Sequence, residues 1–104
     1  MKLLTGDIVS FTDDNNDVKY WLCNSVDYIN AKYIHMGYVS ANTYNEESSV
    51  KVTSRKNNVY SFDINNRCGE DKLNNPEVVD SIDYAEMAEF HSKMADKRKR
   101  GYNA

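Results

Sequence analysis

A chain of 104 residues with a formal net charge of −3 fits one domain and is too short to enclose a deep catalytic cavity. The balance of 16 acidic and 13 basic side chains excludes a general attraction to nucleic acid or to anionic membranes. No apolar run approaches the roughly 18 residues of a membrane span, and residues 1–4 are too short for the apolar core of a signal peptide. We therefore expect a cytoplasmic protein with no membrane partner.

The first part of the chain alternates β-type segments with a turn cluster. We expect a first strand over residues 3–11, with apolar side chains on both faces, which is typical of a central strand. Residues 12–17 follow as a turn, because Asp and Asn side chains bond to their own backbone. A second strand begins at Val18. The segment 24–32 fits either a continuation of that strand or a loop with a helical turn.

Three further strands complete the predicted sheet. The strand over residues 33–40 is interrupted by Gly37, and a glycine inside a strand often marks a bulge or a barrel corner. Residues 49–53 alternate between inward valines and outward polar side chains, which indicates a half-buried strand. A short turn at residues 55–58 then predicts a hairpin that leads into a strand over residues 59–64.

The sequence pattern of the C-terminal part predicts a helix. Residues 67–75 are polar and predict a surface loop, and Asn75-Pro76 is a helix-start signal because Asn caps helices and Pro fits the first helical position. We therefore predict a helical part over residues 76–100. Val78, Val79 and Ile82 lie on a different face from the main stripe, which favours a bend or two apolar faces. The main stripe has helical spacing and consists of Tyr84, Met87, Ala88, His91, Met94 and Ala95.

The expected architecture is one α+β domain over residues 1–104. A five-stranded, strongly curved antiparallel sheet or SH3-like barrel spans residues 1–66, and the C-terminal helix follows. Four segments resemble the SH3-like small barrels, including the Tudor and KOW-type modules: Gly6-Asp7-Ile8-Val9, Gly37-Tyr38-Val39, Val50-Lys51-Val52 and Tyr60-Ser61-Phe62-Asp63. The resemblance implies a non-enzymatic scaffold that binds peptides, proteins or nucleic acid through loops and an aromatic groove. An OB-type barrel or an irregular α+β fold is the alternative.

No motif commits the chain to a reaction. Cys23, Cys68, His35 and His91 are too far apart in the sequence for the short ligand spacings of a structural zinc site. The four glycines stand singly, so no phosphate-binding loop is present. The turn at 12–17 lacks the Gly and the terminal Glu of a calcium-binding loop. We therefore expect no catalytic residue, no metal and no cofactor, and a small enzyme is the least favoured alternative.

Aromatic residues provide most of the candidate binding surface. The chain has eight tyrosines, and a small core cannot enclose so many large rings, so several are expected at the surface, where tyrosine is favoured in protein interfaces. The alternative is that half of them fill the core and the rest reflect AT-rich codons. The residues that we favour for contact with a protein are Tyr28, Tyr33, Tyr38 and Tyr44, with Asp13, Asp14 and Asp17 setting the electrostatic preference.

Two other surfaces compete with this one. Trp21 with Lys51, Arg55 and Lys56 has the aromatic and basic groups that bind single-stranded nucleic acid or a nucleotide, and a basic run follows at residues 97–100. The helical stripe of Met87, His91 and Met94 either packs on its own sheet or forms an interface, including one with a second copy of this chain.

Composition also bears on origin. The chain is rich in Asn, Lys, Tyr and Ile, which AT-rich codons encode, and it has only one proline and four glycines. A short cytoplasmic protein from an AT-rich genome suits a bacteriophage or a low-GC bacterium. We therefore expect a non-enzymatic, phage-type accessory protein that binds and modulates or inhibits a host protein, such as a defence enzyme or a nucleic-acid enzyme.

Overall fold

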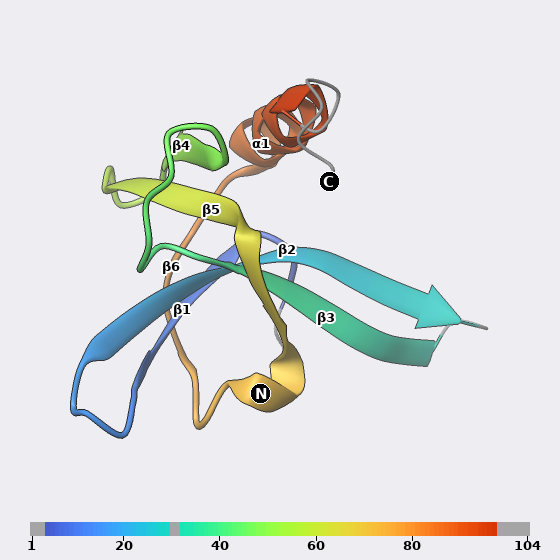
Figure 1. Cartoon of the computed structure of the whole chain (residues 1–104). Coiled ribbons are helices and arrows are strands. Elements are labelled where there is room, and N and C mark those ends of the chain that lie inside the picture. Colours follow the sequence, from blue (N-terminus) through green and yellow to red (C-terminus); the bar gives the residue numbers. More distant parts are fainter. Residues whose placement is uncertain (1–3, 30–31, 98–104) are drawn as a thin grey trace.

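In the residues that the structure describes, six antiparallel strands form one strongly curled sheet, and one α-helix follows them (Figure 1). The computed structural model describes residues 4–29 and 32–97, with side chains described for residues 4–24 and 37–97. The strand order is β4-β5-β3-β2-β1-β6. The strands are β1 (Asp7–Thr12), β2 (Val18–Ile29), β3 (Lys32–Ser40), β4 (Ser49–Thr53), β5 (Val59–Gly69) and β6 (Glu77–Ser81), and the helix is α1 (Tyr84–Lys97). The predicted α+β class, with a curved sheet and a C-terminal helix, is confirmed.

The sixth strand corrects the sequence prediction. We predicted five strands and a helical part over residues 76–100, whereas residues 77–81 form β6 and pair with β1. Asn75 has a positive φ of 49°, so the chain makes a left-handed turn there instead of starting a helix. The polar segment before it is also shorter than predicted, because β5 continues to Gly69 and a short 3-10 helix occupies Glu70–Lys72.

The strands β2 and β3 form a long hairpin whose far end extends away from the other strands (Figure 1). Residues 24–29 continue β2, which decides between the two interpretations of that segment. Cys23 pairs with Tyr38 and Ser25 pairs with Gly37, so Asn24 is an extra residue on β2. The irregularity predicted at Gly37 is therefore present, with the bulge on the strand opposite the glycine.

Apolar clusters cover both faces of the sheet. β1 contributes to both of them, through Ile8 on one face and Val9 on the other, as expected of a central strand. The first cluster lies under α1, which buries Met87 and Phe90 in it; its members are Ile8, Leu22, Val39, Val50, Val52, Phe62, Ile64, Ile82, Met87 and Phe90. The second cluster is smaller and contains Val9, Cys23, Tyr38 and Leu73.

A buried carboxylate joins the two ends of the sheet. Asp80 lies on β6 with 5% of its surface exposed, and its hydrogen-bond donors come mainly from β4–β5 hairpin residues at the opposite end of the strand order. These donors are Ser54 Oγ, Asn58 Nδ2 at 3.1 Å, the Lys56 amide at 3.3 Å and Tyr60 Oη at 3.4 Å, together with the neighbouring Ser81 amide at 2.8 Å. The Arg55 amide also donates to the Ser81 carbonyl over 2.8 Å. The curvature of the sheet is therefore held by bonds between its first and last strands.

The hydrogen bonds decide the ionisation of Asp80. Burial alone raises the pKa of this carboxyl, because a charge is costly away from water. The bonds from Ser54, Ser81, Asn58 and Lys56 stabilise the ionised form and outweigh burial, so the pKa lies below its ordinary value of 3.8. Asp80 is therefore an acceptor of hydrogen bonds at neutral pH.

We expect Asp80→Asn to lower the free energy of unfolding by about 2–4 kcal/mol, because the new amide places N–H donors against the donors of its neighbours. Urea denaturation followed by circular dichroism at neutral pH measures the change. The matched control is Asp14→Asn in the exposed turn, which should change stability by less than about 0.5 kcal/mol. Equal urea midpoints for Asp80→Asn and the wild type would contradict this role.

The lowered pKa of Asp80 also predicts a pH dependence of stability. The unfolded chain has the ordinary pKa of 3.8, so its Asp80 binds a proton at a higher pH than the folded protein does. The stabilisation is present well above pH 3.8 and is lost as the pH falls through the lower pKa of the folded state. The difference in Tm between the wild type and Asp80→Asn should therefore shrink between about pH 6 and about pH 2. A difference that stays constant over that range would show that the charge is not what stabilises the sheet.

Candidate functional site

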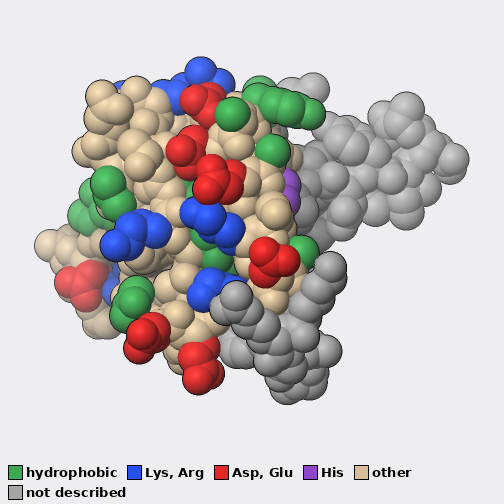
Figure 2. All heavy atoms as spheres, turned by 90° about the horizontal axis from the view of Figure 1, so that it is seen from above, with side chains coloured by type: hydrophobic (Ala, Val, Ile, Leu, Met, Phe, Trp, Pro, Cys, Tyr) green, Lys and Arg blue, Asp and Glu red, His purple; other side chains and the backbone are tan. Residues whose placement is uncertain are grey.

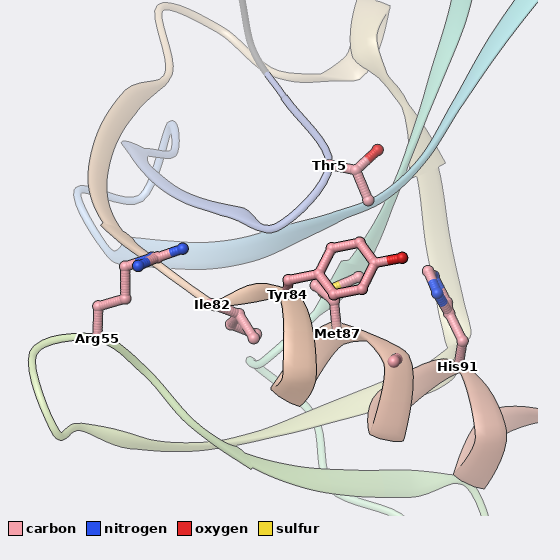
Figure 3. Close-up of a pocket in the computed structure, with 7 residues that line it drawn as sticks. Thr5, Arg55, Ile82, Tyr84, Met87 and His91 are labelled. Carbon is pink, nitrogen blue, oxygen red and sulfur yellow. The ribbon is translucent and has the colours of Figure 1, made fainter.

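An open pocket of about 420 Å³ lies beside the first two turns of α1 (Figure 3). Its volume is within the range of roughly 300–1,000 Å³ that is usual for ligand pockets. Three segments that are far apart in the sequence meet here: the residues before β1, the turn between β4 and β5, and the start of α1. The residues that line it, which we call the α1 pocket, are Thr5, Arg55, Ile82, Tyr84, Met87, Ala88 and His91.

A close backbone approach positions the start of the helix. Gly6 has a φ of +99°, and a Cβ built on it would lie 3.0 Å from the Ile82 carbonyl oxygen. The Ile82 amide donates to the Gly6 carbonyl over 2.8 Å. Asp83 then caps the helix, since its Oδ1 accepts from the Glu86 amide at 2.9 Å. The segment before β1 and the first turn of α1 are thus held together at the α1 pocket.

The α1 pocket has an apolar floor and a mixed rim. Ile82 and Met87 are 4% and 6% exposed and form the floor. Tyr84 is 90% exposed on the rim, where its ring extends across the mouth of the pocket toward the side of His91, and Arg55 lies at the other end (Figure 3). An exposed aromatic ring and a cation therefore lie at the rim of a pocket whose floor consists of buried apolar side chains.

His91 links α1 to the bulge in β2. Its Nε2 lies 2.9 Å from the carbonyl oxygen of Asn24. A carbonyl oxygen only accepts, so Nε2 carries the hydrogen, and Nδ1 is the other polar atom of the ring. The side-chain Oδ1 of Asn24 is buried without a hydrogen-bond partner. The imidazole is therefore fixed at one nitrogen while the side chain stays exposed on the pocket rim.

None of the described residues that line the α1 pocket is acidic. Two ion pairs between described side chains are Lys19–Asp13 at 3.8 Å and Lys93–Glu89 at 3.0 Å. Arg55 takes part in neither of them and is exposed. The rim of the pocket therefore carries a positive charge that no described carboxylate pairs with directly.

The structure separates the tyrosines that we predicted as contacts. Tyr38 is fully buried in the second cluster, and burial, followed by the nearby Cys23, raises its pKa, so its prediction as a contact residue is wrong. Apolar clusters cover both faces of the sheet at β3, so Tyr38 has no exposed face. Tyr44 is 70% exposed in the loop before β4, and its role in binding stays a prediction. The side chains of Tyr28 and Tyr33 lie outside the described residues.

The acidic turn has a structural explanation. Asp13 Oδ1 accepts hydrogen bonds from the amides of Asn15 and Asp17, each at 2.9 Å, and Asn16 adopts a positive φ of 67°. This is the Asx turn expected from the sequence. Asp14 and Asp17 are exposed, and the electrostatic role proposed for the three aspartates remains a prediction.

The predicted nucleic-acid residues are divided between sites. Arg55 lines the α1 pocket, whereas Lys51 lines a second hollow of about 200 Å³ between β4 and the later turns of α1. We call this second hollow the lysine groove; its residues are Ser49, Val50, Lys51, Lys93, Asp96 and Lys97. Lys56 is exposed, and Trp21 packs against the second cluster. The four residues therefore do not line one shared hollow.

The predicted helical stripe is partly packing and partly surface. Met87 is buried, Met94 packs half-buried against the first cluster and His91 is exposed. The first half of this stripe lines the α1 pocket. Sequence reasoning placed Tyr84 on the stripe but did not name it with the possible interface residues Met87, His91 and Met94. Its position directly after the helix cap Asp83 is the signal that would have found it.

Comparison with known proteins gives no relative: no family model, curated protein or solved structure matches this chain. Within the described ranges, no three His, Cys, Asp or Glu side chains gather where they could hold a metal ion. In the same ranges, no helix is long and apolar enough to cross a membrane.

We expect Met87→Asp to unfold the protein, because removing a buried Met alone costs about 2–5 kcal/mol and the new charge would have no partner in the first cluster. Circular dichroism and size-exclusion chromatography report the loss of structure. Ala85→Asp on the exposed side of the same helix is the matched control and should fold normally. A folded Met87→Asp variant would show that the stripe is an interface and not packing.

Proposed function

We propose that this chain is a non-enzymatic binding protein, built as an SH3-like barrel variant, that recognises another protein through the surface around the α1 pocket. The observation that supports it is the arrangement of the exposed Tyr84 and Arg55 over the buried floor of Ile82 and Met87. Aromatic residues and arginine over a desolvated floor are typical of the few residues that carry most of the energy of a protein interface.

The chemistry of the α1 pocket suits binding better than catalysis. The Nε2 of His91 donates to a backbone carbonyl, which leaves Nδ1 as the acceptor of the ring, and the described lining has no Ser, Cys, Asp, Glu or Lys that could form a catalytic pair with it. The one described thiol that is not fully buried, Cys68, has its pKa raised to about 11, first by burial and then by Asp71, so it is protonated at neutral pH and a poor nucleophile. This thiol is also not among the described residues that line the α1 pocket.

The proposed biological role is that of a phage-type accessory protein that modulates or inhibits a host protein, such as a defence enzyme or a nucleic-acid enzyme. The AT-rich composition and the small size support this role. A domain this small that acts by blocking needs only a rigid surface, and the α1 pocket is built on a helix, a tight turn and a strand end that hydrogen bonds hold together.

The test is affinity capture from host lysate with tagged wild-type protein, Tyr84→Ala and Tyr44→Ala, followed by mass spectrometry. We expect one stoichiometric protein that survives nuclease and high salt, is lost with Tyr84→Ala and is retained by Tyr44→Ala. Truncation of an interface anchor typically costs about 2 kcal/mol or more, which is enough to remove the partner in a wash. Both variants change exposed side chains and should remain folded. Loss with Tyr44→Ala alone would place the contact on the loop before β4 instead.

A second candidate function is binding of single-stranded nucleic acid, and the lysine groove favours it. Lys51, Lys93 and Lys97 line one hollow, and Lys97 Nζ bonds to the Glu46 carbonyl at 3.4 Å. Asp96 lines the same hollow and Glu89 pairs with Lys93, so the positive charge is partly neutralised. Figure 2 shows acidic and basic side chains interspersed over this side of the molecule.

This second candidate predicts that a fluorescent single-stranded oligonucleotide binds with an affinity that falls steeply as salt rises. Replacing Lys51 and Lys93 with Gln should reduce the salt slope by about one to two ion equivalents. Fluorescence anisotropy at several salt concentrations measures the slope, and Lys19→Gln, far from the groove in the sheet order, serves as the control. An unchanged slope in the double variant would exclude the groove.

A further inference from the structure

We propose that the α1 pocket accepts a large apolar side chain of the partner protein that lies next to a carboxylate in the partner's sequence. This inference rests on the proposed function, and it names the chemistry that the partner segment must present. The pocket floor selects the apolar group, and the rim selects the acid.

The floor and the volume define the apolar part. Ile82 and Met87 are almost completely removed from solvent, and Ala88 leaves open space above them because its side chain is a single methyl group. A pocket of about 420 Å³ has room for one large aliphatic or aromatic side chain but not for a folded element. The Tyr84 ring, which reaches across the mouth, would pack along such a side chain (Figure 3).

The rim defines the charged part. Arg55 provides a guanidinium whose planar fork matches a carboxylate. Among the described residues no Asp or Glu lines the pocket, although the chain as a whole has a net charge of −3. A partner carboxylate would therefore meet a local positive rim on an otherwise acidic protein, whereas a partner lysine would face Arg55 at close range.

The backbone behind the rim is held before any partner binds. The Arg55 amide donates to Ser81, and the next residue, Lys56, donates its amide to Asp80, so the turn that carries the guanidinium is bonded to β6. At the opposite end, Nε2 of His91 is bonded to Asn24. A rim anchored in this way loses little backbone freedom on binding, which favours recognition of a short segment.

The experiment uses four capped tetrapeptides and the whole protein. Their sequences are Gly-Phe-Glu-Gly, Gly-Phe-Gln-Gly, Gly-Phe-Lys-Gly and Gly-Ala-Glu-Gly, and backbone amide shifts are followed by NMR up to about 10 mM peptide, because short ligands bind weakly. We expect shifts at the amides of Arg55, Ala88 and His91. The Phe-Glu peptide should bind about fivefold more tightly than the Phe-Gln peptide. The Phe-Lys and Ala-Glu peptides should bind more weakly than either.

Two variants test the pocket itself. Ala88→Glu places a larger side chain and a negative charge at the mouth, and it should weaken the Phe-Glu peptide at least tenfold. Ala85→Glu makes the same change on the exposed side of the helix, outside the pocket lining, and should leave binding unchanged. Arg55→Gln should keep the Phe peptides bound but remove the preference for Glu over Gln.

Equal affinities for the Glu, Gln and Lys peptides, or the absence of shifts at the pocket, would overturn the inference. These outcomes are distinguishable from failure of the proposed function. If lysate capture depends on Tyr84 while the peptides show no preference for acid, the inference fails and the proposed function stands. If the wild type captures no protein at all, the proposed function fails and the inference fails with it.

Discussion

The hydrogen bonds that converge on the buried carboxylate of Asp80 are the constraint on which the rest of this structure depends. A curled antiparallel sheet that does not close into a barrel leaves its first and last strands without partners across the gap. Here the turn between β4 and β5 donates hydrogen bonds to the side chain of Asp80 on β6. These bonds take the place of the backbone hydrogen bonds that would close a barrel. The same bonds place Arg55 beside the start of α1. One carboxylate thus helps to hold both the curled sheet and the turn that carries Arg55.

The helix depends on this curvature in turn. α1 packs over the first cluster through Met87 and Phe90, and the ring of Phe90 meets Phe62 edge-on with ring centroids 6.4 Å apart. Phe62 stacks on Tyr60, whose hydroxyl also reaches Asp80. A row of aromatic rings therefore connects the helix to the hydrogen bonds that hold the sheet. Because the pocket floor belongs to the same cluster, the lining of the α1 pocket is continuous with the core and rests on well-packed side chains.

The alternation of apolar and polar residues was enough to predict most of the sheet, and it failed where one signal had two meanings. Val50 and Val52 were placed correctly because their neighbours are polar. Residues 77–81 were assigned to a helix because Asn75-Pro76 has the composition of a helix start, although Asn75 also tolerates the left-handed turn that it adopts here. Tyr38 was predicted as a contact residue because the sequence does not show whether β3 is covered on one face or on both. That depends on how the whole sheet is packed. The α1 pocket was beyond sequence reasoning, since its lining comes from three separated segments, and only the spacing of Tyr84, Met87, Ala88 and His91 hinted at a shared face.

The strand order also determines when this protein can become complete. β1 is the first strand in the described part of the chain, yet one of its two partners, β6, is the last, so its second edge stays unpaired until almost the whole sheet has been synthesised. Contacts between such distant segments form slowly, because the intervening chain must lose conformational entropy before the contacts can stabilise the fold. Before β6 is available, the chain therefore exposes the unpaired edge of β1, a strand that is apolar on both faces. In this state the chain is prone to pair with other chains. Pairing of β6 and docking of α1 after the other strands have formed is the order of events that this strand order favours.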